Sequence, residues 1–203
     1  MNSPFDLDYQ NYSADARIVA ALERIAQAFR VLLWNESKEY GLSPVQIQLL
    51  IFLYFQPESR RTVSALAEAF DLTRPTVSDS VKILKQKGLV KRITNPDDAR
   101  SHSLALTAKG KKITKETLRF TSELQKPVKE MTADEKENLL FSLLQIIHHL
   151  NQAGVITIQR MCLGCAFYRK NHNGHKHYCK LLNTALDTSS VRLDCPDYEK
   201  IPE

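Results

Sequence analysis

The sequence predicts a mainly α-helical fold that contains one short β-hairpin and carries a small cysteine-bearing extension at its C-terminal end. Three observations support this prediction. Before the cysteines, apolar residues recur at spacings of three and four, which is typical of amphipathic helices. The segments "LVKRIT" and "HSLALT" instead alternate apolar and polar residues, as strands do. All four cysteines lie in the last fifth of the chain.

The composition indicates a soluble globular protein. The chain has 203 residues, of which 43% are hydrophobic and 25% are charged, enough for one large domain or one domain with an appendage. The first residues, "MNSPFDLDYQ", lack the basic and apolar regions of a signal peptide, and no stretch approaches the roughly 18 apolar residues of a membrane span. We therefore expect a cytoplasmic protein without membrane contact, in which thiols stay reduced and clustered cysteines bind metal.

The positive charge is concentrated in one segment. The net charge is +5, but residues 59–112 carry 12 basic and 5 acidic side chains, a local surplus of +7. Such a concentration is expected of a nucleic-acid-binding surface. A solvated, lysine-rich face would account for the charge alone equally well.

Two helices are predicted before this basic segment. The first, "ADARIVAALERIAQAFRVLLW", ends at Gly41 after a polar stretch. Its apolar stripe consists of Ile18, Leu22, Ile25, Phe29 and Leu32 or Leu33. The second helix begins with Ser43 as N-cap and Pro44 at its first position, and runs through "VQIQLLIFLYF" to Pro57. Its near-continuous apolarity implies burial on most sides.

The basic segment opens with two short helices. "TVSALAEAF", capped by Thr62, and "RPTVSDSVKILKQKG" are separated only by the turn "DLT". Pro75 fits the first turn of the second helix, and Gly88 fits its C-terminal end. Val77, Val81 and Leu84 form a narrow buried stripe opposite a polar face. This is the pattern of a helix-turn-helix.

A β-hairpin and two further helices follow. The turn-forming segment "NPDDARS" separates the two predicted strands, so they form a hairpin directly after the second short helix, as in a winged helix-turn-helix. Thr107 is expected to cap a long helix, "AKGKKITKETLRFTSELQ", which Pro127 breaks. Thr132 and Glu135 form a capping box for the helix "ADEKENLLFSLLQIIHHL".

The run "LAEAFDLTRPTVSDSVKILKQKGLVKRITNPDDARSHSLALTAKGKKI" resembles the MarR family of winged-helix transcriptional regulators. The resemblance extends over residues 12–153, including the flanking helices, and implies a DNA-binding and dimerisation domain. It implies a homodimer, joined by N- and C-terminal helices, that binds double-stranded DNA at a pseudo-palindromic operator. Residues 154–203 are not part of the ordinary family pattern and form a predicted C-terminal extension.

The resemblance and the helical spacing indicate which residues contact DNA. Four outward residues of the second short helix are expected to meet the major groove: Arg74, Thr76, Ser78 and Lys82. Arg74 is suited to pair with guanine. Arg100, in the hairpin, resembles the family's arginine that enters the minor groove, and Asp98 is expected to hold its guanidinium. Lys91 and Arg92 are expected to contact phosphates.

The cysteines form the pattern C-x2-C-x13-C-x15-C. The four candidate metal ligands are Cys162, Cys165, Cys179 and Cys195. The CxxC step, with Gly164 easing the turn, lets two thiolates bind one centre. We therefore predict a metal site rather than disulfides. Three nearby histidines lie in "RKNHNGHKHY", which is interpreted as a solvated loop and not as a source of ligands.

The identity of the metal stays open between two alternatives. Structural zinc commonly uses two compact knuckles, and only one is present here. A [4Fe-4S] cluster also uses four thiolates and tolerates dispersed ones, because each sulfur binds a different iron. The segments "CLGCAFY", "YCKLL" and "DCPDYE" resemble the small high-potential-type cluster domains of glycyl-radical decarboxylase small subunits. That resemblance implies a [4Fe-4S] cluster, with zinc as the alternative.

The predicted function is that of a DNA-binding transcriptional regulator, of the repressor type, whose cluster senses redox state or iron. One alternative is the same regulator with a purely structural zinc. A different class is a protein-docking or electron-transfer module in which the winged helix is secondary. The sequence contains no nucleophile–base pair, phosphate loop or carboxylate constellation, so an enzyme is not expected.

Overall fold

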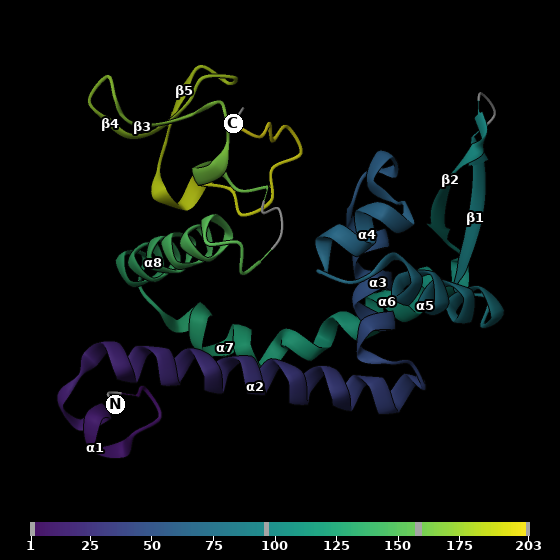
Figure 1. The fold of residues 1–203 in the computed structure, drawn as a ribbon, viewed down its shortest axis with the longest axis horizontal. Helices are drawn as coiled ribbons and strands as arrows, with labels where there is room; N and C mark the ends of the chain where they lie inside the picture. The colour runs from purple at the N-terminus through teal and green to yellow at the C-terminus, as the bar shows by residue number, and fades with distance from the viewer. Residues whose placement is uncertain (1–2, 96–97, 157–159, 202–203) are drawn as a thin grey trace. The chain divides into compact units, whose positions relative to one another are not determined.

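The computed structural model describes residues 3–95, 98–156 and 160–201, and for residues 94, 95 and 98–101 it describes the backbone only. Helices dominate, with two small antiparallel sheets (Figure 1), so the predicted mainly helical fold with a small hairpin is confirmed. Backbone contacts divide the chain into two units: Met1–Thr62 with Ser78–Gln125, and Val63–Val77 with Lys126–Glu203. Within the described ranges, no helix has the length and apolarity to cross a membrane.

The first unit begins with two capped helices. Helix α1 (Leu7–Tyr12), which the sequence analysis missed, starts where the Asp6 carboxylate accepts hydrogen bonds from the amides of Asp8 and Tyr9. Helix α2 (Ala14–Tyr40) starts at Ser13, whose hydroxyl accepts from the amide of Ala16. It ends at Gly41, which has a left-handed backbone conformation with φ of 59°. The predicted end of this helix is therefore confirmed.

The apolar stripe of α2 is only partly covered within one chain. Leu33 is buried, but Ile18, Ile25 and Phe29 are 54%, 48% and 44% exposed. Such large aliphatic and aromatic side chains at helical spacing usually contact another surface. The stripe was predicted correctly, but most of it does not belong to the core of this chain.

Helix α3 (Pro44–Phe55) supplies the core of the first unit. It begins with a capping box, in which the Ser43 hydroxyl accepts from the Gln46 amide and the Gln46 side chain accepts from the Ser43 amide. Pro44 occupies the first turn, as predicted. The fully buried leucines and isoleucine of this helix are Ile47, Leu49, Leu50 and Leu53. A 3-10 turn, η1 (Glu58–Arg60), follows it.

The next two helices form the predicted helix-turn-helix. Helix α4 (Val63–Ala69) is followed by a tight turn, in which the amide of Phe70 bonds to the Leu66 carbonyl and the amide of Leu72 to the Ala67 carbonyl. Asp71, between them, has a φ of 53°. Helix α5 (Arg74–Gln86) then starts, and continues across the boundary between the two units without interruption.

Strands β1 (Val90–Asn95) and β2 (Asp98–Leu106) form the predicted antiparallel hairpin, with Val90 opposite Leu106. The amide of Leu104 bonds to the carbonyl of Arg61, which fastens the hairpin to the end of η1. The expected turn over residues 95–101 was too long, because β2 already begins at Asp98. Pairing resumes between Asn95 and Asp98 after an irregularity beside Thr94.

Helix α6 (Ala108–Thr117) packs closely on the hairpin. The Thr107 hydroxyl caps it by accepting from the Gly110 amide at 3.0 Å, and donates to the Gly88 carbonyl at 2.6 Å. A Cβ atom at Gly110 would lie only 2.0 Å from the carbonyl oxygen of Leu89. Only glycine allows this approach, so this position fixes the distance between α6 and the hairpin.

The prediction that Pro127 breaks the helix after Thr107 was wrong. The break comes earlier, at the 3-10 turn η2 (Leu118–Thr121), and Pro127 lies inside the following helix α7 (Ser122–Glu130). The hydroxyls of Thr114 and Thr117 donate to the carbonyls of Gly110 and Thr114, and such bonds bend helices. Helix α7 is a new helix, and it ends three residues after Pro127. The proline has no N–H group, so it removes one hydrogen bond from this short helix, but the helix still forms.

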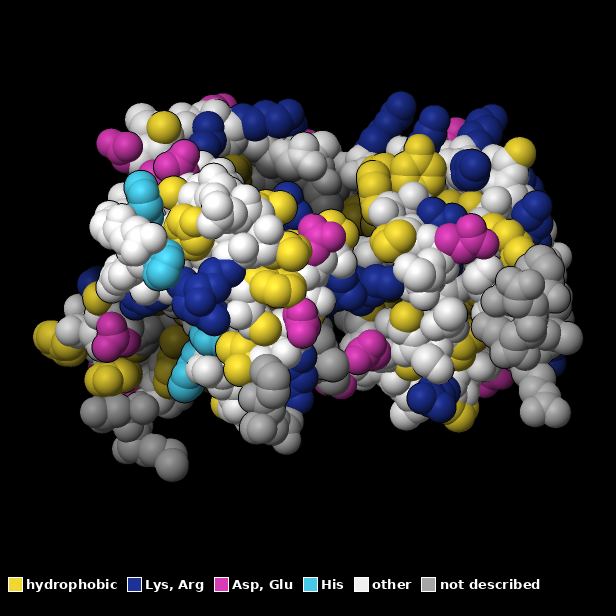
Figure 2. Space-filling view, turned by 90° about the horizontal axis from the view of Figure 1, so that it is seen from above, with side chains coloured by type: hydrophobic (Ala, Val, Ile, Leu, Met, Phe, Trp, Pro, Cys, Tyr) yellow, Lys and Arg dark blue, Asp and Glu magenta, His cyan; other side chains and the backbone are white. Residues whose placement is uncertain are grey.

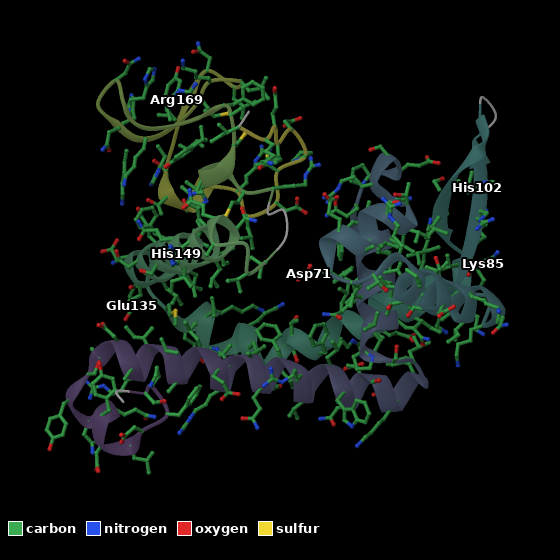
Figure 3. The ribbon with its side chains drawn as sticks, in the orientation of Figure 1. Asp71, Lys85, His102, Glu135, His149 and Arg169 are labelled. Atoms are coloured by element: carbon green, nitrogen blue, oxygen red, sulfur yellow. The ribbon has the colours of Figure 1, made fainter. Side chains whose placement is uncertain are left out.

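Helix α8 (Ala133–Gln152) begins with the predicted capping box. The Thr132 hydroxyl accepts from the Glu135 amide, and the Glu135 carboxylate accepts from the Thr132 amide at 2.8 Å. The hydrogen bonds that the Glu135 carboxylate accepts from the amide and the hydroxyl of Thr132 lower its pKa below the ordinary value, so the acceptor is ionised at neutral pH. Glu135 is labelled at this end of α8 in Figure 3.

A T132A substitution is expected to lower the free energy of unfolding of the second unit by about 1 kcal/mol. The substitution removes the hydroxyl that accepts from the Glu135 amide, so one N-terminal amide of α8 loses its hydrogen-bond partner. The measurement is the melting temperature at neutral pH. T132S keeps the hydroxyl and should melt like the unchanged protein. Equal losses in T132A and T132S would show that the threonine methyl group, rather than the cap, matters.

The residues after α8, here called the tail (160–201), form a small sheet of their own. A 3-10 turn, η3 (Cys162–Gly164), precedes strands β3 (Tyr168–His172), β4 (His175–Cys179) and β5 (Thr184–Leu186), and η4 (Thr188–Ser190) follows them. The strands are antiparallel in the order β3-β4-β5. The interpretation of "RKNHNGHKHY" as a loop was therefore wrong, because most of it is a hairpin that turns at residues 173 and 174.

The tail and α8 share one hydrophobic core. Leu144 of α8, Met161, Cys162 and Val191 are all buried together, and their exposed fractions lie between 1% and 9%. The partly buried side chains around them are Leu140, Ile147, Leu163, Tyr168 and Leu186. The tail is therefore built onto the surface of α8, as the ribbon shows (Figure 1).

Candidate nucleic-acid interface and cysteine site

Helix α5 separates its apolar and polar residues on opposite sides. Val77, Val81 and Leu84 are buried, with exposed fractions of 0%, 6% and 0%, as predicted. The hydroxyl of Thr73 accepts from the amide of Thr76 at 3.3 Å and lies 2.7 Å from the Thr76 hydroxyl. The first turn of the helix is therefore held by threonine side chains.

The four residues predicted to meet the major groove are exposed on α5: Arg74, Thr76, Ser78 and Lys82. Arg74, Ser78 and Lys82 are four residues apart, so they follow one another along a single side of the helix. This arrangement gives an exposed polar and basic ridge on a helix whose narrow apolar stripe is buried. Thr76, held by Thr73, is the least free of the four.

The hairpin residues are described less completely. Lys91 and Arg92 are exposed on β1, opposite Ala105 and Leu104. The side chains of Asp98 and Arg100 lie outside the described residues, although both positions belong to β2. The predicted minor-groove contact therefore stays a prediction.

Two features near these residues were missed from the sequence. Lys109 of α6 donates from its ammonium group to the carbonyl of Lys87, just after α5 ends, and so adds positive charge beside the final carbonyls of the helix. His102 of β2 has a buried Nδ1 atom without a hydrogen-bond partner among the described groups. Lys85 and His102 are labelled in Figure 3, and basic side chains line one edge of the half that carries α5 and the hairpin (Figure 2).

The four cysteines line one cavity in the tail, here called the sulfur cavity, with a volume of about 320 Å³. They come from separate places: Cys162 and Cys165 flank η3, Cys179 ends β4, and Cys195 lies near the end of the tail. All four thiols are free of disulfides. The apolar part of the lining is Phe167, Leu181, Leu182 and Leu186.

The sulfur atoms are close enough to influence one another. The pKa of Cys162 is raised, mainly because the thiol is buried, and in addition because Cys195, Cys165 and Cys179 lie nearby. A hydrogen bond from the backbone amide of Arg192 to the Cys162 sulfur, at 3.2 Å, acts in the opposite direction. Without a cation, the buried thiol therefore stays protonated at neutral pH.

The loop that carries Cys195 is fastened by two arginines. The guanidinium group of Arg160 donates to the carbonyl oxygens of Cys195 and Pro196 and lies 3.7 Å from the Asp194 carboxylate. The guanidinium group of Arg192 donates to the Cys195 sulfur at 3.5 Å. These contacts hold the most distant of the four cysteines beside the other three.

The four cysteines supply a donor set, but no metal site is shown. Among the described residues, no group of three or more Cys, His, Asp or Glu side chains is spaced to hold a metal ion. Four thiols that line one cavity are a donor set that suits zinc as well as an iron–sulfur group. The bound metal therefore stays a prediction, with both alternatives open.

The histidines of the tail do not line the sulfur cavity where the structure describes it. His177, expected in a solvated loop, is instead 1% exposed. Its Nδ1 atom lies 2.6 Å from the Tyr168 hydroxyl, and its Nε2 atom 3.5 Å from the Thr188 hydroxyl. Its ring also contacts the ring of Phe141 on α8. His177 is therefore a buried residue that joins the tail to α8, and burial lowers its pKa.

The comparisons with known proteins concern the winged helix. Residues 40–101 match the sequence model of the MarR family. Over 98 residues the chain is 29% identical to the HTH-type transcriptional regulator SarZ of Staphylococcus haemolyticus (strain JCSC1435), an alignment that covers 48% of this chain and 66% of that protein, slightly under two thirds. The match to the family model ends at residue 101, so it carries no information on the cysteines.

Solved structures agree on the fold. The chain is similar to S. aureus MepR in complex with DNA, with a TM-score of 0.57, 22% identity, and coverage of 65% of this chain and 97% of that one. It is also similar to S. aureus MepR in its DNA-binding conformation, with a TM-score of 0.58, 22% identity, and coverage of 66% and 98%.

The segment from the end of α2 to β2 is thus a winged helix-turn-helix. It contains two short helices joined by a tight turn and followed by a β-hairpin, and solved structures share this fold. Residues 40–101 of this segment are similar to the MarR family. The resemblance that the sequence suggested is therefore supported over these residues.

Proposed function

We propose that this protein is a transcriptional regulator that binds an operator through its winged helix and acts as a repressor. The observation that carries this proposal is the ridge of Arg74, Ser78 and Lys82, exposed on a helix whose other side is buried. The relatives support it, since SarZ is named a transcriptional regulator and MepR has been solved with DNA.

DNA recognition would use α5 and the hairpin together. An α-helix fits the major groove, where Arg74 can pair with a guanine edge and Lys82 can contact a phosphate. Lys91 and Arg92 of β1 would add phosphate contacts without sequence preference. Arg100, oriented by Asp98, would enter the minor groove.

The operator-binding form would be a homodimer. The exposed apolar side chains of α2 support this: Ile18, Val19, Ile25, Phe29, Val31 and Trp34 are all between 44% and 54% exposed. A monomer in water rarely leaves such a face uncovered. A second copy of the chain would cover it and would present two α5 helices to the half-sites of a pseudo-palindromic operator.

The tail would hold a [4Fe-4S] cluster through Cys162, Cys165, Cys179 and Cys195. Support comes from the four free thiols, their common cavity, and the N–H groups of Arg192 directed at two of the sulfurs. When bound, such a cluster supplies one-electron redox chemistry and sensitivity to oxidants. A structural zinc held by the same four thiolates is the alternative occupant.

The bound cluster would act as a sensor through α8. Cys162 belongs both to the sulfur cavity and to the core that Leu144 of α8 shares with Met161 and Val191. Loss of the cluster would leave four thiols without a common partner and would loosen that core. Operator affinity would then depend on redox state or iron supply.

The first test is composition. The full chain, purified without oxygen, is expected to contain iron and acid-labile sulfide and to absorb visible light. A colourless protein with one zinc per chain and no sulfide would contradict the cluster and support the structural zinc instead. Iron and sulfide below one cluster per chain would be resolved by reconstitution with iron and sulfide.

The second test is DNA binding. Duplexes selected from a random library with the cluster-loaded protein are expected to share a pseudo-palindromic sequence. Loaded and stripped protein are then titrated onto the selected duplex. Equal affinities would remove the sensing role and leave the regulator. Failure to select any duplex, with the cluster present, would instead favour a docking or electron-transfer module.

A further inference from the structure

The cationic side chain of Arg192 donates a hydrogen bond to a sulfur of the cavity. We propose that Arg192 is a positioning and charge-compensating residue of the cysteine site, which favours the reduced form of the iron–sulfur group held there. This inference rests on the proposed cluster and adds a role for a residue that is not itself a ligand.

Arg192 reaches two of the four sulfur atoms in different ways. Its backbone amide donates to the Cys162 sulfur at 3.2 Å, and its guanidinium group donates to the Cys195 sulfur at 3.5 Å. The amide of Cys162 in turn donates to the carbonyl of Arg192 at 3.0 Å. The backbone of residue 192 is thus tied to the first cysteine, while its side chain extends to the last.

The ion pair of Arg192 keeps its guanidinium group at the cavity. One of its terminal nitrogens lies 3.7 Å from the Asp197 carboxylate, and both side chains are about half exposed, at 45% and 50%. Asp197 also lines the sulfur cavity. The guanidinium group therefore has two anionic partners in the loop, the carboxylate of Asp197 and the thiolate that Cys195 becomes when it binds metal.

The direction of the effect follows from charge. A one-electron reduction of an iron–sulfur group bound by the four thiolates would make that group one unit more negative. A cation and an N–H donor directed at its sulfurs stabilise that state more than the oxidised one. Partial exposure to water moderates the effect but leaves its sign unchanged.

The experiment compares midpoint potentials of the cluster-loaded full chain, titrated with dithionite and followed by visible absorbance. R192Q is expected to shift the potential to more negative values by about 59 mV, which is a tenfold change in the reduced-to-oxidised ratio of a one-electron couple. R192K, which keeps the charge but loses the forked geometry, is expected to shift it less in the same direction. R169Q is the matched control.

Arg169 makes a suitable control because it lies in the same tail, is exposed, and donates to the carbonyls of Ala166 and Tyr168 rather than to a sulfur (Figure 3). R169Q should keep the potential of the unchanged protein. The inference would be overturned if the unchanged protein, R192Q, R192K and R169Q all had the same potential, or if R192Q and R169Q shifted it equally. Either result would leave the proposed cluster itself intact.

Iron and sulfide are measured in the same samples, so the two proposals fail separately. An unchanged protein without iron and sulfide contradicts the proposed cluster. If R192Q binds less iron than the unchanged protein, its potential is not used, and the potential of R192K tests the inference instead. A potential of R192K at or above that of the unchanged protein would then overturn the inference.

Discussion

A variant with R74A and K82A is expected to bind the selected duplex about 100-fold more weakly than the unchanged protein. Both side chains are exposed along one side of α5. Loss of a base contact costs about 1–3 kcal/mol, and a lost phosphate contact adds a smaller, sequence-independent loss. About 2.7 kcal/mol in total corresponds to a factor of 100.

The measurement is a titration of labelled duplex at several salt concentrations. K82A alone should reduce the slope of log affinity against log salt by about one, whereas R74A alone should also relax the preference for one base. The control is R24A with R169A, which removes the same number of charges from exposed positions on α2 and β3. If the control weakens binding as much as the α5 variant, the effect is one of net charge, and α5 does not read the operator.

Replacement of Cys162 with serine is expected to reduce the iron and sulfide bound per chain at least tenfold. Serine offers a harder oxygen ligand in place of the soft thiolate that iron–sulfur groups require. Cys162 is also 9% exposed and packs with Leu144 and Met161, so the polar hydroxyl would weaken the shared core. We therefore expect faster proteolysis of the tail as well as loss of colour.

H175A is the matched control for C162S. His175 is exposed at the turn between β3 and β4 and does not line the sulfur cavity. It should keep the full iron and sulfide content. Retention of both in C162S, or their loss in H175A, would contradict the assignment of four cysteines as the ligands.

Much of the helical framework was predictable because helix ends depend on local chemistry. Ser43 with Pro44, Thr132 with Glu135, and Gly41 each mark a helix end in the positions that the sequence indicated. A cap involves residues only three apart, and a left-handed glycine involves one. The buried side of α5 was predictable for the same reason, since it follows from spacing along one helix.

The two errors had different sources. Pro127 was expected to break a helix, but the break comes earlier, at η2, directly after the turns in which the Thr114 and Thr117 hydroxyls bond to helix carbonyls. These bonds are local, and the strong signal of a proline outweighed them in the sequence analysis.

His177 was placed in a solvated loop, but it is enclosed by Tyr168, Thr188 and Phe141, the last 36 positions earlier in the chain. No short window of sequence contains His177 together with Phe141.

The grouping of the four cysteines was predictable from their spacing, and they do line one cavity. That they bind a metal stays a prediction. The two arginines that fasten the last cysteine were not predicted. Arg160 lies 35 residues before Cys195. Arg192 is only three residues from Cys195, but its backbone amide also bonds to the Cys162 sulfur, 30 residues earlier. Basic residues near cysteines carry no distinctive sequence signal, so only the folded chain indicates which of them face sulfur.

The common core of α8 and the tail has a consequence for anyone who wants to isolate the winged helix. A shortened chain ending near residue 156 would keep α8 but strip away Met161 and Val191, the side chains that shield Leu144. The aliphatic side chains of α8 that the tail covers would then be exposed to water, and the fragment would tend to self-associate. Polar substitutions at Leu140, Leu144 and Ile147 would have to accompany such a deletion.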